Sequence, residues 1–126
     1  MTITLKVSDE LISDLLCTAL EGGSNYWYML GDVDSTHFVK GDTFVDNLAR
    51  SFIADKDYKL DVYDLESDED EPELLGSVNY RDMEWALTEM ALEYPKMYAN
   101  IVAEQFDADD ADVWFQLATM GEIVFG

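Results

Sequence analysis

The sequence predicts an α+β fold, in which a small, mostly antiparallel sheet is covered by about four to five helices. Three observations predict it. Short segments alternate apolar and polar residues, as half-buried strands do. Longer segments carry apolar residues at helical spacing, behind a residue suited to a helix N-terminus. Three such helical segments follow one another near the C-terminus. We expect a single domain over residues 1–126, because neither a repeat nor an interdomain linker interrupts the chain.

The segment 8–28 is the part around which we expect the rest to be organised. Ser8 is suited to cap a helix, because its hydroxyl can accept a backbone N–H of the first turn. The residues that follow place an apolar stripe on one helix face, and Cys17 lies on that stripe as a small buried residue. Gly22 and Gly23 predict an end in the left-handed conformation. An aromatic cluster, Tyr26-Trp27-Tyr28, comes directly after.

The strands are predicted from alternation and from turn signals. We expect them over residues 2–7, 27–30, 58–64 and 74–78, with a short closing strand at 123–125. The first and last of these strands could pair and bring the ends of the chain together. The run 64–73 between two of the strands is predicted to be a solvated hairpin tip.

The remaining helices are predicted from capping residues and apolar spacing. Asp42 or Thr43 can cap a helix over residues 44–52, and Asn79 caps another with Asp82 at the capping-box position. Tyr94-Pro95 ends that helix and Pro95 begins the next. Asp107, with Asp110 three residues later, caps the last helix, which Gly121 ends.

The charge is the unusual property of this composition. The chain has 28 Asp and Glu residues against 7 Lys and Arg residues, a formal net charge of −21. Solubility alone needs a net charge of only about 2–8 in magnitude. Apolar residues make up 48% of the chain, so it is not a disordered acidic tail. A basic partner, a high-salt habitat and plain tolerance remain as explanations.

Two groups of side chains are candidate contact residues. The acids that we expect a basic partner to contact lie in the run 64–73 and at the start of the last helix. They are Asp64, Glu66, Asp68, Glu69, Asp70, Glu71, Glu73, Asp109, Asp110 and Asp112. Tyr26 and Trp27 could form an aromatic contact surface or could fill the core. Direct nucleic-acid binding is disfavoured, because phosphates would be repelled.

Catalytic and metal chemistry find little support. The chain has one cysteine and one histidine, so zinc is excluded in practice, and His37 lies in a polar loop without a partner motif. The acidic runs at 68–71 and 107–112 lack the glycine of a calcium loop. We expect no enzyme activity, no metal and no cofactor. Neither a signal peptide nor a long apolar run is present, which favours a cytoplasmic protein away from membranes.

Two stretches carry a resemblance. Residues 18–28 (TALEGGSNYWY) and 112–126 (DVWFQLATMGEIVFG) resemble a family of small, largely uncharacterised acidic proteins of tailed phages and prophages. The resemblance covers about a third of the chain and gives no catalytic residues. It implies a phage-encoded protein that acts in the bacterial cytoplasm.

Charge and resemblance together lead to a functional hypothesis. We expect a non-catalytic inhibitor of a host nucleic-acid-binding defence protein, such as a CRISPR effector or a restriction enzyme, that acts by acidic mimicry of DNA or RNA. The alternative is a small phage interaction or assembly module that binds a protein through the Tyr26–Tyr28 rings, with charge serving only solubility. Homodimerisation stays open.

Overall fold

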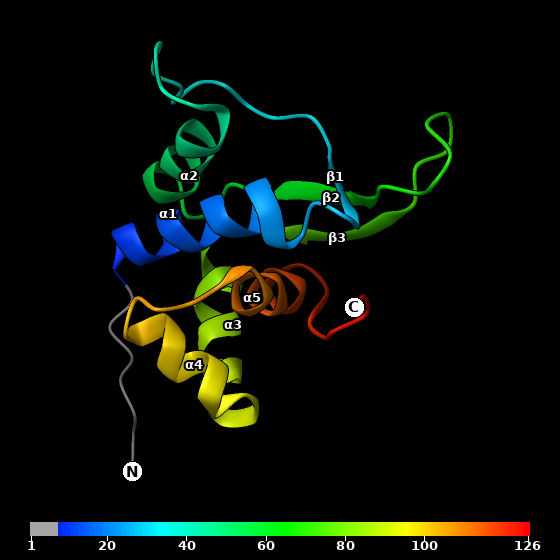
Figure 1. Ribbon diagram of the computed structural model, residues 1–126. Helices are drawn as coiled ribbons and strands as arrows, with labels where there is room; N and C mark the ends of the chain where they lie inside the picture. Colours follow the sequence, from blue (N-terminus) through cyan, green and yellow to red (C-terminus); the bar gives the residue numbers. More distant parts are fainter. Residues whose placement is uncertain (1–7) are drawn as a thin grey trace.

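A computed structural model describes residues 8–126, and it confirms the α+β fold (Figure 1). Within these residues three strands form one antiparallel sheet in the order β1-β2-β3. The strands are β1 (Tyr28–Leu30), β2 (Leu60–Asp64) and β3 (Leu74–Val78). The register pairs Met29 with Tyr63 and Leu60 with Val78, and between Val62 and Tyr63 it skips Leu75, which is the extra residue of a bulge in β3. The predicted hairpin between β2 and β3 is therefore present.

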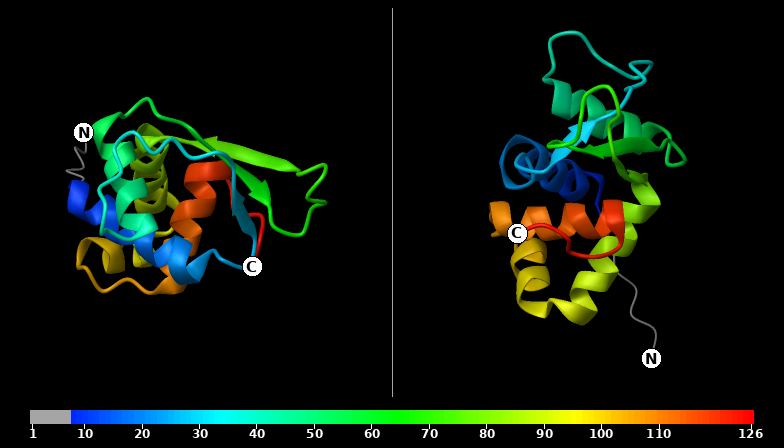
Figure 2. Two further views of the ribbon diagram at one scale, coloured as in Figure 1. Left: turned by 90° about the horizontal axis from the view of Figure 1, so that it is seen from above. Right: turned by 90° about the vertical axis from the view of Figure 1, so that its right-hand side faces the viewer.

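The described residues also form five α-helices, and their bounds agree with the predicted segments. They are α1 (Asp9–Thr18), α2 (Phe44–Ala54), α3 (Tyr80–Glu93), α4 (Pro95–Val102) and α5 (Ala108–Met120). Helix α1 runs across the middle, with α2 and the sheet on one side and α3, α4 and α5 on the other (Figures 1 and 2). None of the helices in the described range is long and apolar enough to cross a bilayer.

Helix α5 is the central element of the packing. It contacts α1, α3, α4, β3 and the π-helical turn Ala19–Gly23. We call residues 19–27, which include this π-helical turn, the turn after α1. Trp114 and Phe115 on α5 are fully buried, and the Trp114 indole donates to the Met83 carbonyl of α3 at 3.1 Å. A helix that is surrounded in this way has few positions left for solvent, so even polar residues of α5 face inward.

The predicted helix starts are confirmed by their hydrogen bonds. The Ser8 hydroxyl accepts the Leu11 N–H, and Thr43 caps α2 in the same way through Asp46. Capping boxes begin α3, from Asn79 with Asp82, and α5, from Asp107 with Asp110. Each such cap satisfies an N–H that the helix itself leaves without a partner. Gly121 ends α5, as predicted, and its φ of 77° lies in the left-handed region.

The end of the first helix differs from the prediction. Instead of a left-handed glycine cap, residues Ala19–Gly23 continue as one turn of π-helix, and neither glycine of the pair has a positive φ. Gly23 is required for another reason: a Cβ there would overlap the Ala108 carbonyl at the start of α5. The close approach of α5, rather than a turn conformation, therefore explains this glycine.

The closing strand predicted at 123–125 is also wrong. These residues form an irregular tail, and a side chain takes the place of a neighbouring strand. The Oε1 atom of Gln116 accepts the N–H groups of Val124 and Phe125, both at 2.9 Å, and its Nε2 atom donates to the Phe125 carbonyl at 3.0 Å. The strand predicted at 2–7, and its pairing with the tail, lie outside the described residues.

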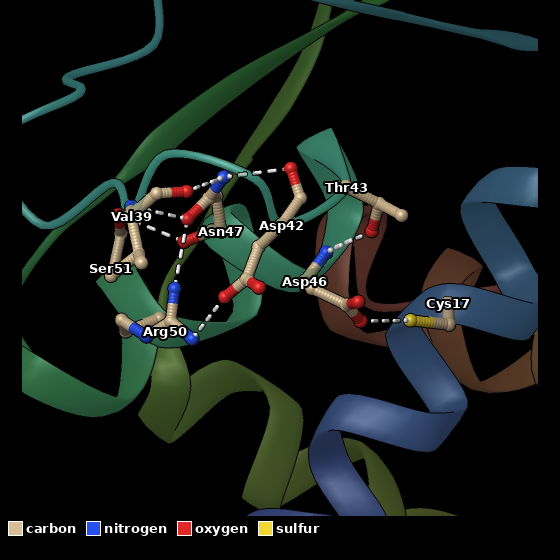
Figure 3. A network of polar contacts seen from close by, with 8 residues as sticks. All are labelled: Cys17, Val39, Asp42, Thr43, Asp46, Asn47, Arg50 and Ser51. Carbon is tan, nitrogen blue, oxygen red and sulfur yellow. Dashed lines mark hydrogen bonds and ion pairs between the residues drawn. The ribbon is translucent and has the colours of Figure 1, made fainter.

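A polar network holds α2 against the loop that precedes it and against α1 (Figure 3). The Asn47 side chain accepts the Val39 N–H at 2.7 Å and donates to the Val39 carbonyl at 3.2 Å. Arg50 donates to Asn47 at 2.8 Å and pairs with Asp42 at 2.6 Å. The irregular chain before α2 is thereby fixed by side chains, because no strand among residues 8–126 pairs with its backbone.

Candidate partner-binding site

The hairpin tip carries the acidic run and extends away from the helices (Figures 1 and 2). We call residues 64–73 the acidic finger. Asp64 is half-buried, and the other six carboxylates of the finger are exposed: Glu66, Asp68, Glu69, Asp70, Glu71 and Glu73. The ion pairs found within residues 8–126 are Arg50–Asp42 and Arg81–Asp57. No lysine or arginine of this range therefore forms an ion pair with the finger.

Hydrogen bonds at its base give the acidic finger a defined shape. The Ser67 hydroxyl donates to the Asp64 carbonyl at 2.6 Å and accepts the Glu73 N–H at 3.1 Å. The Asp64 side chain accepts the Glu66 N–H at 2.9 Å, and the Asp64 N–H donates to the Glu73 carbonyl at 2.9 Å. One hydroxyl thus ties together the two ends of the finger, so the exposed carboxylates stand on a backbone of defined shape.

The base of the finger is anchored on Trp27. The Leu65 N–H donates to the Trp27 carbonyl at 2.9 Å. The Trp27 side chain is 1% exposed and stacks on the Phe125 ring, with centroids 5.3 Å apart and planes at 12°. The prediction that Trp27 belongs to a contact surface is therefore wrong. This ring fills the core where the turn after α1, α5 and the tail meet.

Asp112, a predicted contact acid, is buried and accepts four hydrogen bonds. Its Oδ1 atom accepts the Ser24 hydroxyl at 2.7 Å and the Trp27 indole N–H at 2.8 Å. Its Oδ2 atom accepts the Tyr26 hydroxyl at 2.6 Å and the Gln116 amide at 3.1 Å. The residue is 8% exposed. Its carboxylate therefore joins α5 to the turn after α1 by hydrogen bonds to neutral donors.

Asp110 is likewise withdrawn from the proposed contact surface. It is 4% exposed, and its Oδ2 atom accepts the Asp107 N–H at 3.1 Å and the Asn100 amide at 3.4 Å. These contacts use the carboxylate as a helix cap. Asp109 remains exposed, as predicted, because its position on α5 faces away from the core. Burial thus separates three neighbouring acids that the sequence could not distinguish.

Tyr26 lies at the edge of the Asp112 cluster and is 45% exposed. Desolvation of its hydroxyl and the hydrogen bond to Asp112 raise the pKa of Tyr26 to about 12. The hydroxyl donates to the Asp112 carboxylate, while part of the ring is still exposed to solvent. Of the two predicted aromatic contact residues, only Tyr26 is available to a partner.

The cysteine and the histidine do not form a catalytic pair. Cys17 is half-buried, and its thiol donates to Asp46 at 3.4 Å (Figure 3). Burial and then this contact with Asp46 raise the pKa of Cys17 to about 12, so the nucleophilic thiolate is absent at neutral pH. His37 lies in the exposed loop before α2. No three His, Cys, Asp or Glu side chains between Ser8 and Gly126 are grouped so that they could hold a metal ion.

Two residues of the Asp112 cluster were missed by sequence reasoning. No role was predicted for Ser24 or Gln116. A signal existed for Gln116, because it is a polar residue within an apolar stretch of α5, one turn after Asp112. Its amide serves both the carboxylate and the tail, and it therefore links the cluster to the C-terminal residues.

Comparisons with known proteins add no assignment. No family model, no curated protein and no solved structure matches the chain. The functional argument accordingly depends on the geometry and charge of the described residues.

Proposed function

We propose that the protein is a phage-encoded, non-catalytic inhibitor that inserts its acidic finger into the basic nucleic-acid-binding groove of a host defence protein in the bacterial cytoplasm. A CRISPR effector or a restriction enzyme has such a groove. The observation that carries the proposal is the finger itself. Seven carboxylates lie within ten residues, on a hairpin that extends from the body, and none of them pairs with a cation among the residues described.

Elementary electrostatics favours this geometry for competition with nucleic acid. A concentrated negative charge steers a basic partner over long range and raises the association rate by roughly 10–10³-fold. Once docked, exposed carboxylates accept charge-assisted hydrogen bonds from arginine and lysine, as phosphate oxygens do. The hydrogen bonds of Ser67 hold the finger in one shape before binding, so less ordering is needed on contact.

The test compares two variants with equal net charge. The finger variant Glu69→Gln/Asp70→Asn/Glu71→Gln and the control Glu10→Gln/Asp14→Asn/Glu21→Gln each remove three exposed carboxylates. Each is used to capture partners from a bacterial lysate, with and without competing duplex DNA. We expect the wild type and the control to retain a nucleic-acid enzyme that DNA displaces, and the finger variant to lose it. Equal loss in both variants would contradict a role for the finger.

Salt supplies a second measurement on the same pair. Raising the salt concentration from a low value to about 0.5 M shortens the Debye length several-fold, so the affinity of the wild type for its partner should fall steeply. An affinity that does not change with salt would exclude mimicry of nucleic acid.

One observation favours the alternative, a module that binds a protein through an apolar surface. Trp85 and Leu92 lie on one face of α3 and are 45% and 67% exposed. They replace the buried Trp27 as the side chains that such a module would use. In this case Trp85→Ala would abolish capture of the partner, whereas the finger variant would retain it.

A further inference from the structure

An open groove of about 770 Å³ lies beside the Asp112 cluster, between α5 and the C-terminal tail. Residues of the turn after α1, of α5 and of the tail line it, among them Tyr26, Asp109, Asp112, Val113, Ile123 and Val124. Its volume falls in the range of roughly 300–1,000 Å³ that is typical of ligand sites.

The wall formed by the tail is held in place by specific contacts. Gln116 binds the backbone of Val124 and Phe125 through three hydrogen bonds, and the Phe125 ring stacks on Trp27. Phe125 thereby occupies the core, while the Val124 side chain is 52% exposed at the groove. Residues 123–125 pair with no strand of the described part of the chain, and they present apolar side chains to solvent in a fixed arrangement.

The groove combines negative charge with apolar walls. Asp109 is exposed at its rim, and the buried Asp112 carboxylate receives hydrogen bonds only from neutral groups. Neither acid belongs to an ion pair within the described chain. Ile123 and Val124 supply aliphatic surface, and Tyr26 supplies an aromatic ring. An anionic ligand would be repelled here, and a fully apolar ligand would leave the carboxylates unused.

We propose that this groove binds an arginine side chain of a partner protein. Its three-carbon stem would lie along Ile123 and Val124, and its guanidinium would meet Asp109 and the Tyr26 ring. The guanidinium is planar, is more weakly hydrated than an ammonium group, stacks on aromatic rings and binds a carboxylate through two N–H groups. The oxygens of Asp112 already accept two hydrogen bonds each, so Asp109 provides the direct contact and Asp112 adds negative potential.

The groove and the acidic finger lie at the same end of the molecule, since the tail and the hairpin tip are on one side in both figures (Figures 1 and 2). A hydrogen bond from Leu65 to the backbone of Trp27 joins the base of the finger to the ring that supports the tail. One basic partner can therefore contact both. The inference that one partner provides both this arginine and the basic groove for the finger rests on the proposed function. The arginine site itself does not depend on it.

The experiment titrates the protein with N-acetyl-arginine methylamide and follows backbone amide shifts by NMR. The citrulline analogue, which has the same shape without the charge, and the lysine analogue are titrated in parallel. We expect saturable shifts at the amides of Asp109, Val113, Ile123 and Val124 with the arginine probe, and about tenfold weaker binding of both analogues. Equal binding of the lysine analogue would overturn the assignment to arginine.

A pair of variants separates a built groove from general attraction to an acidic surface. Val124→Lys and Val102→Lys each add one positive charge at an exposed valine, but only Val124 lines the groove. We expect Val124→Lys to weaken binding of the arginine probe about tenfold, because a positive charge within the groove repels the guanidinium, and Val102→Lys to leave binding unchanged. Shifts spread over the finger and helices, with Val124→Lys binding as tightly as the wild type, would overturn the proposal. Because the probe is used without a partner, this outcome is independent of the capture experiment on the finger.

Discussion

The Trp27 indole donates its N–H to the Asp112 carboxylate at 2.8 Å, across 85 residues of sequence. The ring and the acid, which the sequence suggested as two separate contact residues, are one buried pair. Together with Ser24 and Gln116 they fasten α5 to the turn after α1 and to the tail. The protein thus uses some of its excess acid inside the fold, whereas Asp109 and six carboxylates of the finger remain exposed.

The first prediction concerns this carboxylate. Asp112→Asn places an NH₂ group against two hydrogen-bond donors, so the free energy of unfolding should fall by about 3 kcal/mol. Asp109→Asn, on the same helix but exposed, should change it by less than about 0.5 kcal/mol. Urea denaturation of both variants measures the difference. Equal stability of the two would show that the four hydrogen bonds do not act as described.

The glycine pair gives a second prediction with a matched control. Gly23→Ala would force a Cβ into the Ala108 carbonyl at the start of α5, and should destabilise the protein by about 2 kcal/mol or more. Gly22→Ala meets no atom within 4 Å, and should stabilise the helical turn by about 0.5–1 kcal/mol. Thermal melts report both changes. If Gly23→Ala melted at the wild-type temperature, the close approach of α5 would be refuted.

A third prediction follows from the raised pKa of Tyr26. In the unfolded chain this hydroxyl ionises near pH 10, whereas in the folded chain its pKa is about 12. The stabilisation is therefore complete below about pH 10 and is lost as the pH rises towards 12, because only the unfolded state releases the proton there. The urea midpoint of Tyr26→Phe should fall less steeply over this interval than that of the wild type. Parallel slopes would be inconsistent with the Asp112 contact.

The fourth prediction concerns the reactivity of Cys17. Because the pKa of this thiol is raised to about 12, iodoacetamide should modify it slowly at neutral pH and faster as the pH rises. Asp46→Asn removes the nearest negative charge and should shift the rate profile to lower pH. Asp42→Asn belongs to the same network without contacting the thiol and should leave the profile in place. Mass spectrometry of the modified protein measures each rate.

Much of the fold could be predicted because the evidence for it is local. A capping residue and its partner lie three positions apart, as Asn79 and Asp82 do, and helical or strand spacing repeats within a few residues. The acidic finger was found for the same reason, since a dense run of carboxylates is incompatible with a packed segment. The prediction of a closing strand was wrong because an apolar run such as residues 123–125 fits an irregular tail equally well when the Gln116 side chain, rather than a strand, binds its backbone.

By itself the sequence determined the α+β class, the helix starts, the β2–β3 hairpin and the negative charge. Only the tertiary structure decided which acids are surface charge and which are structural groups. Asp109, Asp110 and Asp112 are near neighbours in sequence, yet Asp109 is exposed, Asp110 accepts the Asp107 N–H within the capping box of α5, and Asp112 binds donors 85–88 residues away. Burial depends on what packs against each side of a helix, and those contacts come from distant parts of the chain.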